Sequence, residues 1–188
     1  MSLFDPHCSP ARGRRRFLRL GAAIVTSTLA VPAWANTPGE RSLAFRNLHT
    51  GEFLRTAYWV DGGYDADALN RIRHLLRDFR AHQVGPLDPG LLDLLWALQR
   101  RMGTREPFHV ISGYRSPKTN AMLRRLGHGV ARHSLHMEGE AIDIRLPGRP
   151  LRQLHAAAVK LRAGGVGYYP QSDFVHVDVG RVRYWRGA

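Results

Sequence analysis

Apolar residues recur at helical spacing in four segments of the chain. The first runs from Ala66 to His82, where apolar residues fall three or four positions apart and Asp65 is placed to cap the N-terminus. The other three predicted helices are 88–102 after Asp88-Pro89-Gly90, 117–126 with Ser116 as the cap, and 151–161 before a Gly-Gly pair.

Shorter segments alternate apolar and polar residues, which is typical of β-strands. The predicted strands are residues 41–49, 52–60, 108–112, 141–144, 166–169, 174–179 and 181–185. No internal repeat or low-complexity linker divides these segments. The pattern therefore predicts a single α+β domain, in which helices pack on a small antiparallel sheet.

The first 35 residues have a different pattern. Arg14-Arg15-Arg16-Phe17-Leu18 precedes an apolar run that is shorter than the about 20 residues of a membrane span, and Ala33-Trp34-Ala35 follows it. A basic region, a short apolar region and a small-residue site form a secretory signal. The paired arginines resemble the twin-arginine export motif, although Gly13 stands where that motif usually has Ser or Thr. We expect cleavage after Ala35, export to the periplasm by the twin-arginine route, and a domain of residues 36–188 without stable membrane insertion.

Charge and cysteine content limit the binding partners and metal ligands that residues 36–188 can have. The whole chain has a formal net charge of +13; its first 35 residues hold five arginines and one aspartate, so residues 36–188 keep +9. No nucleic-acid-binding signature accompanies this surplus, so we expect an acidic partner such as a wall polymer or lipid headgroups, and no nucleic acid. The only cysteine, Cys8, precedes the predicted cleavage site. Disulfides and sulfur ligands are therefore excluded from the expected domain.

Two of the predicted strands place candidate metal ligands on their polar faces. In 141–144, Asp143 lies opposite the isoleucines, and in 174–179, His176 and Asp178 lie opposite the valines. If these strands are neighbours, His136, Asp143 and His176 can converge, and Gly139 lets the intervening loop fold back. Two imidazoles and one carboxylate with an open fourth position are the ligand count of a catalytic zinc site. By spacing alone, surface histidines or paired core histidines remain equally open.

Several motifs together carry a resemblance to a known family. Ser134-x-His136-x-x-Gly139-x-Ala141-x-Asp143 resembles the signature of the zinc peptidases that include D-alanyl-D-alanine carboxypeptidases, D-alanyl-D-alanine dipeptidases and the hedgehog domain. The turn Ser112–Ser116 is similar to the turn of that family whose arginine lies in the active site. Residues 112–120, 165–170 and 174–178 also resemble the YcbK-type murein endopeptidases, which carry a twin-arginine-like signal. The similarity covers nearly all of residues 36–188.

This resemblance implies roles for individual residues. His136, Asp143 and His176 would hold Zn²⁺ with water in the fourth position, and Arg115 would stabilise an oxyanion or hold a substrate carboxylate. Dipeptidase relatives have a Glu general base three residues before the second histidine, where this chain has the shorter Asp173. Asp178 is the competing candidate for the general base. Alternatively, it orients a zinc ligand without binding the ion itself. The aromatic residues Tyr168, Tyr169 and Trp185 line a cleft or belong to the core.

The predicted function is that of an exported, zinc-dependent murein endopeptidase, monomeric, acting on peptidoglycan stem peptides. The YcbK-type resemblance implies hydrolysis of crosslinks between two diaminopimelate residues. Two alternatives stay open: a D-alanyl-D-alanine carboxypeptidase or dipeptidase, and a non-catalytic zinc-containing module that binds the cell wall. A structural zinc site normally has four protein ligands, and three are found, which favours an enzyme.

Overall fold

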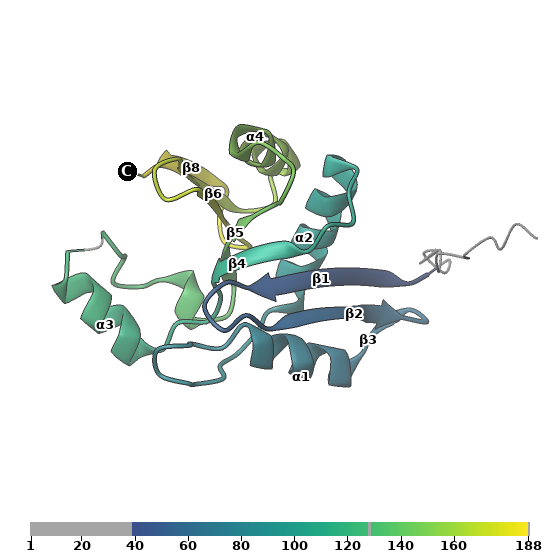
Figure 1. Ribbon diagram of the computed structural model, residues 1–188, viewed down its shortest axis with the longest axis horizontal. Coiled ribbons are helices and arrows are strands. Elements are labelled where there is room, and N and C mark those ends of the chain that lie inside the picture. Colours follow the sequence, from purple (N-terminus) through teal and green to yellow (C-terminus); the bar gives the residue numbers. More distant parts are fainter. Residues whose placement is uncertain (1–38, 128, 188) are drawn as a thin grey trace, which may run out of the picture. The chain divides into compact units, whose positions relative to one another are not determined.

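The computed structural model describes residues 39–127 and 129–187, so the predicted signal segment lies outside the described residues. The elements follow the chain in the order shown in Figure 1: β1 (Arg41–Asn47), β2 (Phe53–Val60), β3 (Gly63–Tyr64), α1 (Ala66–Leu75), α2 (Pro89–Met102), β4 (Phe108–Ser112), α3 (Pro117–Arg125), the 3₁₀ turn η1 (Leu135–Met137), β5 (Ala141–Arg145), α4 (Leu151–Leu161), β6 (Gly165–Tyr169), β7 (Phe174–Asp178) and β8 (Arg183–Arg186). None of the helices in these ranges is long and apolar enough to cross a membrane.

The described strands form one sheet in the order β3-β2-β1-β4-β5-β7-β6-β8. Neighbouring strands are antiparallel except for the parallel pairs β1–β4 and β6–β8. The predicted α+β class is confirmed, and the sheet extends over more strands than the small sheet expected from the pattern. The β1–β2 hairpin turns at His49-Thr50-Gly51, as predicted, with Gly51 at a positive φ of 74°.

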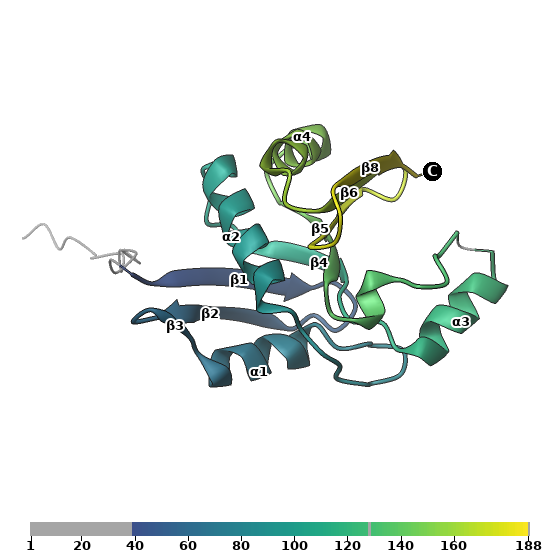
Figure 2. The same ribbon diagram turned by 180° about the vertical axis from the view of Figure 1, so that it is seen from behind.

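Helices α2 and α4 pack against each other and against the sheet, as Figures 1 and 2 show from two sides. The leucines of α2 and the apolar residues of α4 form one core with the inward side chains of β5 and β7, which include Ile142, Ile144, Val175 and Val177. Since side chains alternate along a strand, the opposite face of β5 and β7 is left for the polar residues. This layering directs the candidate ligands away from the apolar core.

Helix α1 is shorter than the predicted helix 66–82, because the chain turns after Leu75. The cause lies in Asp78, a buried carboxylate that accepts hydrogen bonds from the backbone N–H groups of Arg80 and Ala81. It also accepts from the backbone N–H and the hydroxyl of Ser116, at 2.9 and 2.7 Å. Aspartate competes with helix continuation by bonding nearby backbone groups. The apolar spacing up to residue 82 therefore did not predict the end of this helix.

The other three helices match the prediction closely. Asp88 caps α2 by accepting from the Gly90 N–H, and Gly103 ends it at a left-handed φ of 59°. Ser116 caps α3 by accepting from the Thr119 N–H, and Pro117 occupies the first turn, where its missing N–H costs no hydrogen bond. The capped start of α3 and its bond to Asp78 hold the turn that precedes this helix.

Candidate metal centre and active site

Three candidate ligands meet on the polar face of β5 and β7. Asp143 and His176 are direct partners in the antiparallel pairing of these strands. His136 reaches them from η1, which is joined to β5 through Gly139. Gly139 has a φ of +71°, and a Cβ built there would lie 2.1 Å from the Pro86 carbonyl oxygen. Only glycine fits this close approach, which brings η1 back against the sheet.

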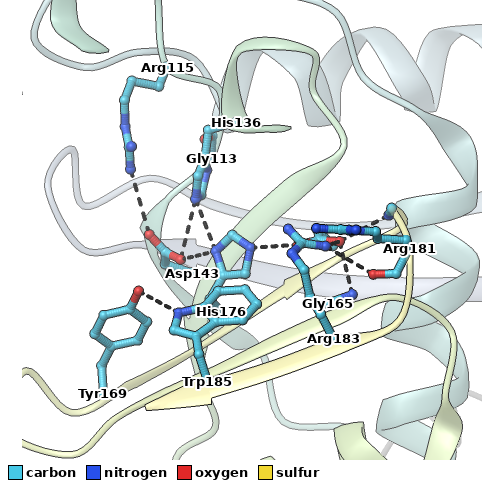
Figure 3. Close-up of polar contacts among 12 residues, drawn as sticks. Gly113, Arg115, His136, Asp143, Gly165, Tyr169, His176, Arg181, Arg183 and Trp185 are labelled. Atoms are coloured by element: carbon cyan, nitrogen blue, oxygen red, sulfur yellow. Dashed lines mark hydrogen bonds and ion pairs between the residues drawn. The ribbon is translucent and has the colours of Figure 1, made fainter. Parts of the chain in front are cut away.

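The ligand atoms of the three residues lie within 4.8 Å of one another and are buried. Nε2 of His136 is 3.3 Å from Nδ1 of His176, and Oδ1 of Asp143 is 2.9 Å from that same Nδ1. Figure 3 shows the two rings and the carboxylate turned toward one another. The predicted convergence is therefore present in the structure. Two nitrogens and one oxygen, without sulfur, suit Zn²⁺, so the residues fit the ion that the motif implies.

In each histidine, the ring nitrogen that points away from the cluster makes a hydrogen bond that fixes the ring. Nδ1 of His136 donates to the carbonyl of Gly113 at 2.7 Å, and Nε2 of His176 donates to Oδ2 of Asp178 at 3.0 Å. Such bonds select the tautomer and the ring orientation of a metal-binding histidine. They leave Nε2 of His136 and Nδ1 of His176 facing the cluster.

The charges inside the cluster are strongly coupled. Burial lowers the pKa of His136 and would also lower that of His176. For His176, however, hydrogen bonds to Asp143 and Asp178 prevail and raise the pKa to about 9. Burial opposes ionisation of Asp143, yet the two neighbouring imidazoles hold the pKa of its carboxyl below the ordinary range. The cluster thus offers a carboxylate beside an imidazole that is protonated at neutral pH, and a cation can replace that proton.

Asp178 is completely buried, with 0% of its side chain exposed. Its Oδ1 accepts from the backbone N–H groups of Gly165 and Gly180, both at 2.9 Å, and from Arg183 at 3.0 Å. Its Oδ2 accepts from Arg183 at 2.7 Å as well as from His176. Burial would raise the pKa of Asp178, but these bonds, first those from His176 and Arg183, hold it below its ordinary value. Both oxygens of the Asp178 carboxylate are therefore fully occupied by hydrogen-bond donors. Asp178 contacts the ring nitrogen of His176 that faces away from Asp143.

Asp173 has the opposite surroundings. It lies in the turn between β6 and β7 with a positive φ of 52°, and 58% of its side chain is exposed. Its Oδ2 is 2.7 Å from Nη1 of Arg145, at the end of β5. In the described part of the chain, Asp173 makes no hydrogen bond to the three clustered residues. Of the two candidate bases, the structure leaves only Asp173 open to solvent.

Arg115 lies beside the cluster, in the turn before α3. Its backbone N–H donates to the carbonyl of His136 at 3.0 Å, and its Nη2 is 3.9 Å from Oδ2 of Asp143 and 3.4 Å from the hydroxyl of Ser112. The side chain is 11% exposed, and its Nε has no hydrogen-bond partner among residues 39–127 and 129–187. Burial lowers the pKa of Arg115, but a guanidinium remains a cation at neutral pH. Arg115 therefore offers unused donors to an anionic group.

The sequence pattern indicated Tyr169 and Trp185 as cleft or core residues, but it did not predict how β6 and β8 bring Arg183 and Trp185 to the site. A Cβ at Gly165 would lie 2.5 Å from both Arg183 Nη1 and Asp178 Oδ2, and one at Gly167 would lie 2.6 Å from the indole of Trp185. The two glycines thus let side chains of β8 cross β6 and reach β7. Gly167 lies on the predicted strand 166–169 and Gly165 directly precedes it. Two glycines this close together at a strand are a signal of such close approach, and this signal was available in the sequence.

Comparisons with known proteins agree with this geometry. The family model described as peptidoglycan L,D-endopeptidase MepK matches residues 35–185. The peptidoglycan L,D-endopeptidase MepK of Escherichia coli K12 is 45% identical over 175 residues, which cover 92% of this chain and 96% of the relative. The probable peptidoglycan L,D-endopeptidase MepK of Haemophilus influenzae is 44% identical over 181 residues, covering 94% and 97%. No solved structure matches the chain. The resemblance seen in the motifs is confirmed, and the chain belongs to the MepK family of peptidoglycan endopeptidases, a family of metallopeptidases.

Proposed function

We propose that this protein is an exported, zinc-dependent endopeptidase that hydrolyses L,D-peptide crosslinks of peptidoglycan, such as those between two diaminopimelate residues. The observation that carries the proposal is the convergence of His136, Asp143 and His176 beside a buried arginine with unused donors. The names of the relatives support the bond type. They do not favour a D-alanyl-D-alanine carboxypeptidase or dipeptidase.

Metal chemistry supplies the nucleophile in this proposal. His136 and His176 would bind Zn²⁺ through nitrogen and Asp143 through a carboxylate oxygen, and the ion would activate water and polarise the scissile carbonyl. The chain itself keeps the two imidazoles in the required orientation, because Gly113 and Asp178 accept from their outer nitrogens. Three protein ligands leave a coordination position open, which supports a hydrolase over a binding module with a structural zinc.

We assign the general base to Asp173 and a positioning role to Asp178. All the hydrogen bonds of Asp178 point to groups behind His176, so no lone pair is free to take a proton from water. Asp173 is exposed three residues before His176, and its contact with Arg145 involves a single oxygen. Asp173→Asn should therefore abolish turnover with zinc retained. Loss of turnover in zinc-loaded Asp178→Asn alone would show that the assignment is wrong.

Arg115 is proposed to bind the oxygen that becomes negatively charged during hydrolysis, or a carboxylate of the stem peptide. Its backbone is tied to His136, and Ser116 beside it is tied to the buried Asp78. These bonds fix the turn that carries the guanidinium before the substrate arrives, and a donor in a preset position stabilises a transition state well.

Export by the twin-arginine route remains a proposal from the first 35 residues. The exported protein should begin at Asn36, and replacement of Arg14-Arg15 by lysines should block export. We further propose that the protein is a monomer, that its +9 charge favours the anionic cell wall, and that nucleic acid is not a partner.

The test is digestion of defined crosslinked muropeptides by the purified protein, with and without a chelator, followed by addition of zinc. Cleavage that disappears on chelation and returns with zinc would support the hydrolase, and the product masses identify the bond. A folded, zinc-loaded protein that leaves every crosslink intact would instead indicate a binding module. Faster release of terminal D-alanine than of crosslinks would indicate a carboxypeptidase.

A further inference from the structure

Strand β8, at the edge of the sheet, sends Trp185 back over β6 toward the candidate metal centre. In the parallel pairing of β6 and β8, Trp185 lies opposite Gly167, and Gly167 lies opposite His176 on β7. Because Gly167 has no side chain, the indole fits over this position, and its ring centre is 5.1 Å from that of His176. Trp185 therefore forms a wall beside a ligand residue, as seen in Figure 3.

Trp185 in turn fixes the hydroxyl of Tyr169. The indole Nε1 donates to the Tyr169 oxygen at 2.8 Å. An indole N–H can only donate, so the Tyr169 oxygen must accept, and its own O–H must point to a different group. The ring is held as well, since it stacks on Phe174 with centres 4.4 Å apart and planes 17° apart. The backbone of Gly187 is also so close that a Cβ there would lie 2.1 Å from the ring.

Tyr169 lies on the same face of the sheet as the candidate metal centre. Tyr169 is two residues from Gly167 on β6 and so shares the sheet face of His176. Figure 3 shows its oxygen on the same side of the cluster as the Arg115 guanidinium, with Asp143 between them in that view. Among the residues that the structure describes, none accepts the Tyr169 O–H.

We propose that Tyr169 is a catalytic residue whose O–H donates a hydrogen bond to the scissile carbonyl oxygen as negative charge builds on it. Arg115 approaches the same oxygen from the other side, and Trp185 keeps the O–H aimed at it. The proton stays on Tyr169 throughout, so this step forms no covalent bond and needs no co-reactant. The inference rests on the proposed hydrolysis and adds a second donor to it. A preset donor of this kind acts mainly in the transition state.

The test compares Tyr169→Phe with Tyr168→Phe in the purified protein. The two variants lose the same atom from adjacent residues, but Tyr168 faces away from the centre and packs against His155, with ring centres 4.8 Å apart. Tyr169→Phe should lower kcat on a crosslinked muropeptide about 100-fold with KM changed less than about threefold, the usual effect of losing one oxyanion donor. Zinc content should stay at the wild-type value in both variants. Tm should fall only slightly in Tyr169→Phe, which loses the hydrogen bond from Trp185, and Tyr168→Phe should keep its Tm and its kcat.

A second measurement does not depend on turnover. A phosphinate analogue of the crosslink carries a charged tetrahedral oxygen, so Tyr169→Phe should bind it about 10- to 100-fold more weakly, whereas Tyr168→Phe should bind it like wild type. Trp185→Phe should also lower kcat, and it should have little further effect in the Tyr169→Phe background, because it acts through the same hydroxyl.

The outcomes separate this inference from the proposed function. Wild-type protein that cleaves no crosslink would contradict the proposed function, and the phosphinate affinities would still judge Tyr169. Wild-type turnover with an unchanged kcat in Tyr169→Phe would overturn the inference alone. A loss confined to KM, or a loss of zinc that parallels the loss of activity, would also overturn it, because either result would assign Tyr169 to substrate binding or to structure.

Discussion

Replacement of Asp178 by asparagine should weaken metal binding although Asp178 is not itself a proposed ligand. The carboxylate accepts from five donors, which come from Gly165, Gly180, Arg183 and His176. An asparagine of the same shape has one acceptor oxygen, so its amide NH₂ must face donors in either orientation. When it faces His176, the amide donates to Nε2 and favours the tautomer with a proton on Nδ1, the atom that should bind the metal.

The magnitude follows from the burial of this side chain. Loss of a hydrogen bond to a charged group costs about 1.5 to 3 kcal/mol, and here Arg183, whose side chain is 35% exposed, loses its carboxylate partner. Loss of an outer partner of a metal-binding histidine typically lowers metal affinity about 10- to 100-fold. We therefore expect Asp178→Asn to lose about 2 kcal/mol of unfolding free energy and about 10- to 100-fold in zinc affinity.

The assay is zinc titration in competition with a chromophoric chelator, combined with urea unfolding of the metal-free protein. Asp173→Asn is the matched control, because it makes the same chemical change at an exposed carboxylate, and it should keep wild-type zinc affinity and stability. Wild-type zinc affinity in Asp178→Asn would refute the positioning role. Equal losses in both variants would show that general charge, rather than the contact with His176, governs metal binding.

Three further predictions concern other parts of the site. Arg115→Gln should lower kcat about 10²- to 10³-fold with zinc retained, as measured by steady-state kinetics and metal analysis; unchanged kcat would contradict its role. Gly167→Ala should displace Trp185 and lower kcat, whereas Gly63→Ala, where a Cβ meets nothing within 4 Å, should be neutral; equal activity of the two variants would refute the crowding argument. In the metal-free protein, burial would lower the pKa of His176, but hydrogen bonds to two carboxylates raise it to about 9, above the roughly 6.5 of an unfolded histidine. The stability from these bonds should be complete below pH 6.5 and lost as the pH rises to 9, by up to about 1.4 kcal/mol per pH unit; a flat urea-unfolding profile in this window would contradict it.

Local signals marked the candidate ligands, and the resemblance to the zinc peptidases, rather than spacing alone, selected them as a set. Alternation places Asp143 and His176 on polar strand faces, and Gly139 marks the loop that brings His136 back to the sheet. The caps at Asp88 and Ser116 likewise gave the starts of two helices. Each of these features depends on residues within a few positions of one another.

The remaining features depend on partners far apart in the chain. Helix α1 ends early because Asp78 binds Ser116, 38 positions later. Strand β8 follows β7 in the chain, yet it pairs with β6, because β7 is already flanked by β5 and β6. That placement brings Arg183 to Asp178 and Trp185 to Tyr169. Local patterns therefore left open both the role of Asp178 and the part played by the aromatic residues.

The most direct test of the central claim is a crystal structure of the zinc-loaded protein with diffraction data collected at the zinc absorption edge. We expect one anomalous peak per chain, about 2.0 to 2.2 Å from Nε2 of His136, Nδ1 of His176 and a carboxylate oxygen of Asp143. No peak between these three residues, or a zinc ion held by a different set of ligands, would contradict it.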